Sequence, residues 1–398
     1  MSVIKEIEDK LIKFRQTLHK HPEQSNNESG TVKRLKDFIG KYNPDEVFEN
    51  LGGEGILFLF KGNKSGNESG KTILIRAELD ALPLTEDTGL DYRSTKKDTA
   101  HLCGHDGHMA IVSGLAPLLD ENRNYEGIVG LLFQPAEETG EGAQRIMDDA
   151  RFKALTADYI FALHNIPGAP EGTVILKSGI FAMASVGMIV SLHGRSTHAA
   201  HPENGISPGK AIAKIILGVD EVNSSNDYSS LAFATVIHSR LGDEAFGTQP
   251  GAGKLMFTLR AEDDKDIEKL KKNLIKLADT VCAEENLKCT IGFTEEFKAT
   301  VNDPEAVDII RSAAEETAQE IHQIKKPFRW SEDFGRFTTE IKGAMFGLGA
   351  GGDQPELHNP DYDFPDKLIS YGCDIFYRII NDLLHIQKIG NTTEYKQD

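Results

Sequence analysis

Three short apolar runs constrain the fold of this chain more than any other feature. They cover residues 72–77, 128–133 and 159–163, and each is continuous rather than alternating. Such runs, separated by segments of helical pattern, indicate strands that are buried on both faces of an α/β sheet. Polar residues follow each run, and they are Glu78 with Asp80, Glu137 with Glu138, and His164. If the strands are parallel neighbours, these side chains converge on one crevice beyond the carboxyl ends of the strands.

The pattern changes at about residue 184, where apolar residues begin to alternate with polar ones. The segments of this region follow the order β-α-β-β-α-β, which is typical of a ferredoxin-like module. The alternating segments cover residues 186–192, 231–237, 255–259 and 287–293, and the helical ones cover 211–222 and 267–281. After residue 299 the pattern of continuous apolar runs returns. A helix is predicted near residues 304–321, and an apolar run covers residues 344–348.

The sequence therefore predicts a discontinuous α/β domain that is interrupted by a small α+β module. We expect residues 1–183 and 298–398 to form the α/β domain and residues 184–297 to form the inserted module. A chain of 398 residues is long enough for about two such domains.

The charge balance and the cysteine count exclude some classes of function. Lys and Arg total 44 against 62 Asp and Glu, and the net charge of -18 argues against a nucleic-acid partner. Four cysteines are too few for a disulfide framework in a chain of this length, and they indicate a reducing compartment. The sequence has no apolar signal core at its start and no run long enough to span a membrane. We therefore expect a cytoplasmic protein without membrane partners.

The densest group of potential ligands is the segment 103–108, Cys-Gly-His-Asp-Gly-His. It places one thiol, two imidazoles and a carboxylate close together in the chain. Such a group can bind a metal ion, form a satisfied polar turn, or provide a cysteine nucleophile with a histidine base. By itself, the segment leaves these alternatives open.

Further candidates elsewhere in the chain favour metal. Thiolate, imidazole and carboxylate groups lie at predicted strand ends, and they are Cys103, His105, Glu138, His164 and His358. Five ligands, one of them able to bridge, suit a pair of metal ions better than a single tetrahedral ion. The site also needs a base, and Glu137 lies beside Glu138 on a tight turn. An adjacent Glu pair is common on protein surfaces, but its position directly after a buried strand favours a role in the site.

The remaining histidines are interpreted as structural or supporting side chains. His19 and His21 precede Pro22, which we expect to end the first helix, and a surface histidine interacts favourably with a helix C-terminus. The others are His101, His108, His193 and His201.

Several segments of the chain, taken in order, resemble a known family. They are Arg-Gln-Thr-Leu-His at 15–19, Arg-Ala-Glu-Leu-Asp-Ala-Leu-Pro at 76–83, His-Leu-Cys-Gly-His-Asp-Gly-His at 101–108, Gln-Pro-Ala-Glu-Glu at 134–138, Leu-His-Asn at 163–165, Ser-Thr-His-Ala-Ala at 196–200, Ser-Glu-Asp-Phe at 331–334 and Leu-His-Asn at 357–359. These segments are similar to those of the dinuclear metallo-amidohydrolases in the aminoacylase and metallo-carboxypeptidase superfamily. Within it, they resemble the group of hippurate hydrolase, N-acyl-amino-acid amidohydrolase and the plant auxin-conjugate hydrolases.

The resemblance implies that the α/β domain is a metallopeptidase-like catalytic domain and that the inserted module is a lid and dimerisation domain. It also implies two divalent metal ions, zinc, manganese, cobalt or nickel, held by Cys103, His105, Glu138, His164 and His358. Glu137 would be the general base, and Asp80 would support the site. His198 would stabilise the oxyanion, often from the second copy of a dimer, and Arg260 would bind the substrate carboxylate.

Two positions depart from the pattern of this group. Glu78 stands where the group usually has Asp, and we interpret the longer acid as a rearranged hydrogen bond rather than an intrusion on the metals. Residues 246–250, Phe-Gly-Thr-Gln-Pro, replace the usual Asn-Val-Ile-Pro stretch of the lid. Because Gly247 has no side chain to offer a substrate, the substrate preference is expected to differ from that of the group.

The residues and the resemblance together predict an amidohydrolase that uses metal-activated water to cleave N-acyl amino acids, such as acetyl or benzoyl conjugates. A dipeptidase or carboxypeptidase with the same dinuclear site is an alternative. Two others are a hydrolase with Cys103 as nucleophile and His105 as base, and a protein that binds acyl amino acids without turnover. The expected partners are a small-molecule substrate and a second copy of the chain, bound through the lid.

Overall fold

The larger part of the molecule is built on an eight-stranded sheet. The computed structural model describes residues 4–63 and 70–386. The strand order of this sheet is β1-β2-β4-β3-β5-β16-β6-β15. Its strands are β1 (Glu46–Leu51), β2 (Gly55–Lys61), β3 (Thr72–Glu78), β4 (Ile128–Gln134), β5 (Tyr159–Pro167), β6 (Val174–Leu176), β15 (Ile321–Gln323) and β16 (Lys342–Gly351).

The three continuous apolar runs form neighbouring strands in this sheet. β3 is parallel to β4, with Ile73 opposite Val129, and also parallel to β5, with Ile73 opposite Tyr159. β16 contains the run predicted at 344–348 and lies parallel to β5 on its other side. The carboxyl ends of β4, β3, β5 and β16 therefore meet at one edge, which is where open α/β sheets bind their ligands.

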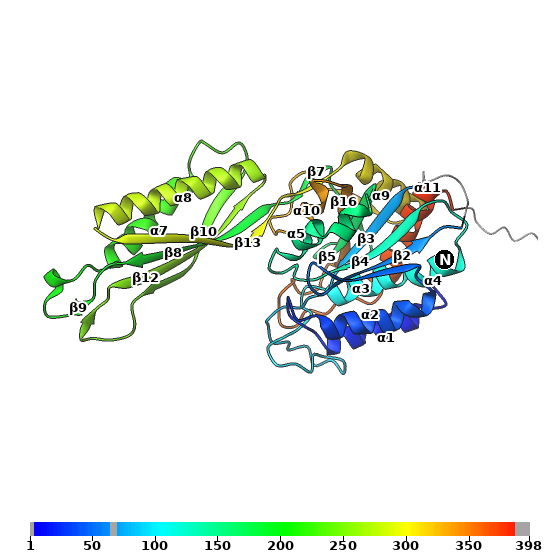
Figure 1. Cartoon of the computed structure of the whole chain (residues 1–398), viewed down its shortest axis with the longest axis horizontal. Coiled ribbons are helices and arrows are strands. Elements are labelled where there is room, and N and C mark those ends of the chain that lie inside the picture. The colour runs from blue at the N-terminus through cyan, green and yellow to red at the C-terminus, as the bar shows by residue number, and fades with distance from the viewer. Residues whose placement is uncertain (1–3, 64–69, 387–398) are drawn as a thin grey trace, which may run out of the picture.

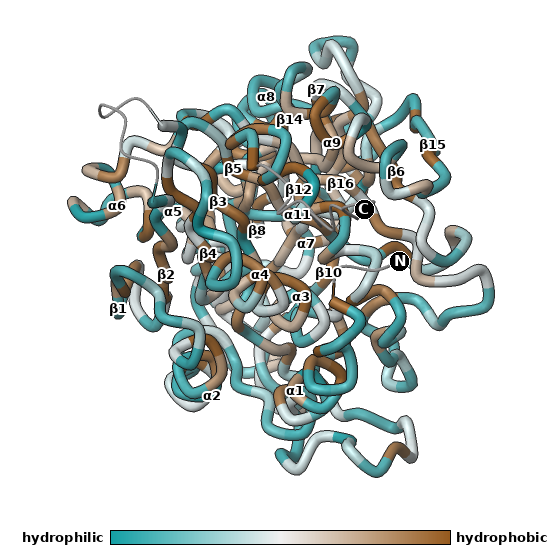
Figure 2. The backbone as a smooth tube through the Cα atoms, turned by 90° about the vertical axis from the view of Figure 1, so that its right-hand side faces the viewer, coloured by the Kyte–Doolittle hydropathy of each residue, from teal (hydrophilic) through white to brown (hydrophobic). Residues whose placement is uncertain are grey.

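Helices cover both faces of the sheet (Figure 1). Ile73 and Ile75 of β3 belong to one hydrophobic core, and Leu74 belongs to the other. The first core is closed by α1 (Glu8–Lys20), α2 (Ser29–Ile39), α3 (His105–Ser113), α4 (Leu115–Glu121), α9 (Pro304–Glu316) and α11 (Leu368–Leu384). The second is closed by α5 (Gly142–Asp148), α6 (Ala150–Ala154) and α10 (Gly335–Thr338). The central strands are continuously apolar because both of their faces are buried, and Figure 2 shows hydrophilic turns around the outside.

The inserted module is a separate four-stranded antiparallel sheet with its own core. Its strand order is β10-β12-β8-β13, so the first strand lies between the third and the fourth, as in a ferredoxin-like fold. The elements are β8 (Ala184–His193), α7 (Gly209–Asn223), β10 (Ala232–Leu241), β12 (Ala252–Ala261), α8 (Asp264–Glu284) and β13 (Lys288–Phe297). The module extends away from the larger part, with both helices on one face of its sheet (Figure 1). The predicted fold class is confirmed, while the domain division at residues 183/184 and 297/298 stays a prediction.

Short elements complete the architecture. They are β7 (Gly179–Ala182) paired with β14 (Thr300–Asn302), β9 (Thr197–His198) paired with β11 (Thr248–Gln249), and the 3₁₀ turns η1 (Gly40–Tyr42) and η2 (Pro202–Asn204). The helix predicted to reach residue 321 was too long: α9 ends at Glu316, and Ala318 has a φ of 59°, which a right-handed helix does not accommodate. Among the described helices, none combines the length and apolar character needed to cross a bilayer.

Candidate metal centre

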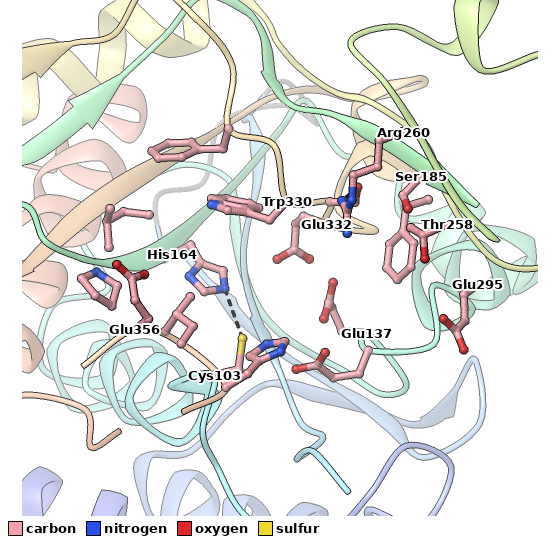
Figure 3. A pocket seen from close by; sticks show the side chains of 18 of the residues that line it. Cys103, Glu137, His164, Ser185, Thr258, Arg260, Glu295, Trp330, Glu332 and Glu356 are labelled. Atoms are coloured by element: carbon pink, nitrogen blue, oxygen red, sulfur yellow. Dashed lines mark hydrogen bonds between the residues drawn. The ribbon is translucent and has the colours of Figure 1, made fainter. Parts of the chain in front are cut away.

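A pocket of about 670 Å³ lies at the carboxyl edge of the central strands, between the larger part and the inserted module, which we call the lid from here on. Residues from both parts line it, including Glu137 and Glu138 after β4, His164 of β5 and Arg260 of β12. Cys103 and His358 also line it, and Figure 3 shows Cys103, His164 and Glu137 facing the same space. The structure thus brings together side chains that are distant in the sequence.

The Cys-Gly-His segment enters α3 at its first residue, His105. Gly104 has a φ of 92°, and a Cβ atom there would lie 2.6 Å from the side-chain oxygen of Asn165. Only glycine fits this position, because any side chain would clash with Asn165. The backbone between Cys103 and His105 can therefore pass very close to Asn165. His105 Nδ1 donates to the carbonyl of Asp80 at 2.8 Å. Its Nε2 is consequently available as a ligand, 3.9 Å from Glu138 Oε1.

The thiol of Cys103 belongs to two clusters of potential ligands. One consists of Cys103, His105 and His164, and the other consists of Cys103, Glu138 and His358. Within each cluster all the ligand atoms lie within 4.8 Å of one another. His164 Nδ1 donates to the carbonyl of Asn165 at 3.0 Å, which leaves Nε2 facing Cys103 Sγ at 3.6 Å. His358 is tied to the same segment, since its N–H donates to the carbonyl of Leu102 at 2.8 Å.

The two carboxylates of the Glu137-Glu138 turn share one cluster with His105, and each also belongs to a second cluster. Glu138 forms part of the cluster with Cys103, while Glu137 groups with Glu332 and Asp333. The Glu138 N–H donates to Asp80 Oδ2 at 3.1 Å. Asp80 therefore holds the Glu137-Glu138 turn through its side chain and His105 through its backbone carbonyl.

Six carboxylates crowd this site, and they belong to Glu78, Asp80, Glu137, Glu138, Glu332 and Asp333. Burial, together with Glu332 and Glu138, raises the pKa of Glu137 well above its usual value. Burial raises the pKa of Glu138 to about 7, although His105 opposes this shift. Buried polar atoms without a partner among the described residues include His105 Nε2, Asp80 Oδ1 and Glu138 Oε1. The site thus contains more carboxylates than basic groups, and several of its potential ligand atoms have no partner. Bound divalent cations would neutralise the carboxylates and supply the missing partners.

The environment of Cys103 does not suit a free nucleophile. Burial and the neighbouring Glu138 raise the pKa of the Cys103 thiol well above its usual value. A catalytic cysteine needs the opposite shift, because the thiolate is the reactive form. The thiol-hydrolase alternative therefore lacks support, whereas a cation at the cluster would favour the thiolate.

Glu78 has two bonded partners, and it also lies close to the candidate ligand His105. Arg76 binds one of its oxygens, and His108 Nδ1 donates to the other at 2.7 Å. Burial alone would raise the pKa of Glu78, but Arg76 and His108 hold it well below its usual value. This geometry agrees with the expectation of a rearranged hydrogen bond, although Glu78 also groups with His105 and His108.

His19 is not the surface residue that the sequence indicated. It is buried, because α1 packs against α3, and its Nδ1 donates to Asp106 Oδ2 at 2.9 Å. Its Nε2 lies 3.3 Å from Glu86. His19 supports the segment that carries His105, but it lies outside the pocket.

Arg260 and His198 occupy different ends of the lid. Arg260 lines the pocket and donates from Nη1 to the carbonyl of Arg329 at 2.8 Å and to Ser331 Oγ at 2.9 Å. His198 is exposed on β9, at the far tip of the lid in Figure 1, and does not line the pocket of its own chain. Thr248 of the divergent stretch 246–250 pairs with His198, so the departure from the family pattern lies beside this histidine.

Several residues of the pocket had no role in the sequence analysis, and Glu332 and Trp330 are two of them. Glu332 belongs to the Ser-Glu-Asp-Phe segment, which resembles the family, but the resemblance gave this residue no role. Trp330 is the single tryptophan of the chain, but no periodic pattern marks its position.

Comparison with known proteins identifies the family. The sequence model of peptidase family M20/M25/M40 matches residues 74–382, which is well over half of the chain. The chain belongs to this family. It is 30% identical to a hippurate hydrolase of Campylobacter jejuni over 95% of the chain and 98% of that protein. It is 29% identical to an N-acetyl-L-cysteine deacetylase of Bacillus subtilis over 95% of the chain and 89% of that protein.

A solved structure has the same fold. It is a Bacillus subtilis protein described as a dinuclear metal-binding peptidase of the M20 family, with a TM-score of 0.79 and 24% identity over 96% of this chain and 99% of that one. The predicted family and the predicted enzyme class, a hydrolase acting on linear amides, are confirmed.

Proposed function

We propose that this protein hydrolyses the amide bond of N-acyl amino acids with the help of divalent metal ions. The position of Cys103 carries the proposal, because its thiol is common to two ligand clusters that lie beside the buried carboxylate of Glu137. A buried base next to a metal cluster is the arrangement that hydrolysis by activated water requires. The similarity to hippurate hydrolase and to N-acetyl-L-cysteine deacetylase supports the same class of reaction.

Two metal ions are proposed because the five ligands divide into two overlapping groups. His105 and His164 belong to one group, and Glu138 and His358 belong to the other, with the thiol of Cys103 in both. The dinuclear relative of the same fold supports this number. Mixed thiolate, imidazole and carboxylate ligands suit zinc, manganese, cobalt or nickel. When bound, the ions would acidify a water molecule and polarise the amide carbonyl.

Glu137 carries out the proton transfers. Its carboxylate takes a proton from the attacking water and passes it to the amide nitrogen as the C–N bond breaks. The products are a carboxylic acid and a free amino acid. The N–H of Asp333, 3.3 Å from Glu137 Oε1, helps to hold the base in position.

Arg260 binds the carboxylate of the amino acid. Its guanidinium is half-buried in the pocket wall and forms no ion pair within the described residues. An unpaired guanidinium facing a pocket is a strong site for a carboxylate, which it can bind through two parallel hydrogen bonds. Replacing Arg260 with Gln should raise KM for N-acyl amino acids at least tenfold and leave their neutral amide analogues nearly unaffected.

His198 acts on the pocket of a second copy of the chain. It is exposed on β9, at the end of the inserted module that lies away from the larger part (Figure 1), and it does not line the pocket of its own chain. The lid also has an edge strand, β10, and exposes Leu217 and Ile237, which are suitable for contact between two copies. Mixing the inactive variants His198→Ala and Glu137→Gln should restore activity, since a mixed dimer contains one complete site. Failure of the mixture to regain activity, with dimers present, would contradict the exchange of His198.

A panel of substrates tests the proposed reaction. Metal-loaded protein should hydrolyse N-acetyl or N-benzoyl amino acids faster than dipeptides, and chelation should abolish this activity. Faster hydrolysis of dipeptides would support the dipeptidase alternative instead. Binding without any turnover would support the non-catalytic alternative.

A further inference from the structure

The pocket has two arms of different chemistry on either side of the candidate ligands. Figure 3 shows Arg260, Ser185 and Thr258 on one side of Glu137, and Trp330 on the other, near His164. We call the second side, where Figure 3 also shows Glu356, the apolar arm. Phe328 stacks there on Trp330, and the pocket lining close to His164 and His358 in the sequence adds the apolar residues Ile166, Pro167 and Leu357. These apolar residues are all half-buried and therefore expose apolar surface that a ligand can cover.

Trp330 forms the central wall of the apolar arm. Its indole stacks on Phe328, with ring centroids 4.9 Å apart and 21° between the ring planes. It meets Phe181 edge-on at 6.0 Å, and its ring lies 5.2 Å from that of His164. The indole thus extends the arm directly from a candidate metal ligand, and its partly exposed ring can stack on another aromatic ring.

The backbone of this wall is fixed before any ligand binds. The N–H of Phe328 donates to the carbonyl of Phe181 at 2.8 Å. The N–H of Met183 is shared between the carbonyls of Phe328 at 3.1 Å and Trp330 at 3.2 Å. Because these bonds already order the wall, a ligand ring would bind it at a small entropic cost.

We propose that the apolar arm binds the acyl group and that Trp330 selects aromatic or similarly large apolar acyl groups over acetyl. This inference rests on the proposed function. With the substrate carboxylate at Arg260 and the amide carbonyl at the candidate ligands, the acyl group is the part that faces the opposite arm. The whole pocket of about 670 Å³ falls in the range of about 300–1,000 Å³ that holds drug-sized ligands, so it has room for an amino acid that carries a large acyl group.

Steady-state kinetics of the metal-loaded protein test the selection. For one amino acid, kcat/KM of the N-benzoyl substrate should exceed that of the N-acetyl substrate at least tenfold. Trp330→Ala should lower kcat/KM for the benzoyl substrate about ten- to a hundredfold, mainly through KM, and change the acetyl value less than about threefold. Trp330→Phe should recover much of the loss because it restores a ring. Phe293→Ala, which removes a ring from β13 outside the pocket, should leave both substrates unchanged.

Tryptophan fluorescence reports the contact directly, since Trp330 is the only tryptophan. In metal-loaded Glu137→Gln, an N-benzoyl amino acid should change the emission in a saturable way. The N-acetyl analogue should produce little change at the same concentrations.

The results separate this inference from the proposed function. Equal or faster hydrolysis of acetyl substrates, or an equal loss for both substrates in Trp330→Ala with unchanged metal content, would overturn the role of Trp330 alone. No hydrolysis of any N-acyl amino acid by the metal-loaded protein would overturn the proposed function itself.

Discussion

Two buried arginines each hold a network of carboxylates, and the networks differ in their balance of charge. Arg15 contacts three carboxylates, which belong to Asp106, Asp363 and Asp366. Arg76 also contacts three, which belong to Glu78, Glu332 and Asp333. Both guanidiniums are fully buried. The two networks therefore differ in the groups around each guanidinium and not in its depth of burial.

Around Arg15, the acids have partners. Burial alone would lower the pKa of His19, but Asp106 and Glu86 raise it to about 9, so a second positive charge joins the network at neutral pH. Asp363 and Asp366 also reach solvent, with 25% and 28% of their side chains exposed. This network links α1 to α3 and to the segment that follows His358. Because its charges are balanced and it joins three segments, we interpret this network as one that stabilises the fold.

Around Arg76, carboxylates outnumber the positive groups. Besides its three partners, the carboxylates of Asp80, Glu137 and Glu138 lie in the same site. The basic groups there are Arg76, His105, His108, His164 and His358, and burial lowers the pKa of His164 to about 3 and also lowers that of His358. A buried surplus of negative charge is costly unless cations bind it. Removing a group from the Arg15 network should therefore reduce stability, whereas removing an acid beside Arg76 should reduce function.

Glu137→Gln should produce the largest effect. Loss of the base should lower kcat for an N-acyl amino acid by about 10²–10⁴-fold. The unfolding free energy and the metal content should not fall, because the change removes one charge from a surplus. Steady-state kinetics and denaturant unfolding measure the two properties, and nearly normal kcat would show that Glu137 is not the base.

Arg15→Met should destabilise the fold by about 3–5 kcal/mol, because it leaves buried carboxylate without its partner. Arg240→Met is the matched control, since Arg240 pairs with Asp243 on the surface and should contribute almost nothing. Denaturant unfolding measures both variants. Equal stability of the two variants would show that the Arg15 network does not support the fold.

Removal of the metal ions should lower the unfolding free energy, because the carboxylates around Arg76 then lose their cations. Saturation with a divalent metal at about 100–1,000 times its Kd adds roughly 3–4 kcal/mol to the unfolding free energy. Chelation should reverse this gain in the wild type, as measured by thermal or denaturant unfolding. In Glu138→Ala the gain should be much smaller. A gain of unchanged size in that variant would exclude Glu138 as a ligand.

His19→Gln should produce the smallest effect and change how stability depends on pH. The folded pKa of His19, about 9, lies above the usual value of 6.5. Its contribution, up to about 3 kcal/mol, is therefore fully present below pH 6.5 and is lost as the pH rises toward 9. Wild-type stability should fall over this range more steeply than that of His19→Gln. Parallel curves would show that His19 is not charged in the fold.

The fold, and the convergence of the candidate ligands at one edge of the sheet, were predictable because local patterns encode them. Continuous apolar runs identified β3, β4 and β5, and polar residues at strand ends identified the convergent edge. The side chains of segment 328–332 were not predictable in the same way, because long-range contacts position them: backbone bonds to Phe181 and Met183 hold Trp330, and Arg76 binds Glu332. The burial of His19 depends on the contact between α1 and α3, which no local pattern reveals.

The metal content of the purified protein, measured by elemental analysis together with hydrolysis of N-benzoyl and N-acetyl amino acids, tests the central claim most directly. We predict about two divalent ions per chain in active protein. Cys103→Ala should lower the metal content and the activity together, since its thiol belongs to both clusters. Amide hydrolysis by a metal-free chain, undiminished by chelation, would contradict the account.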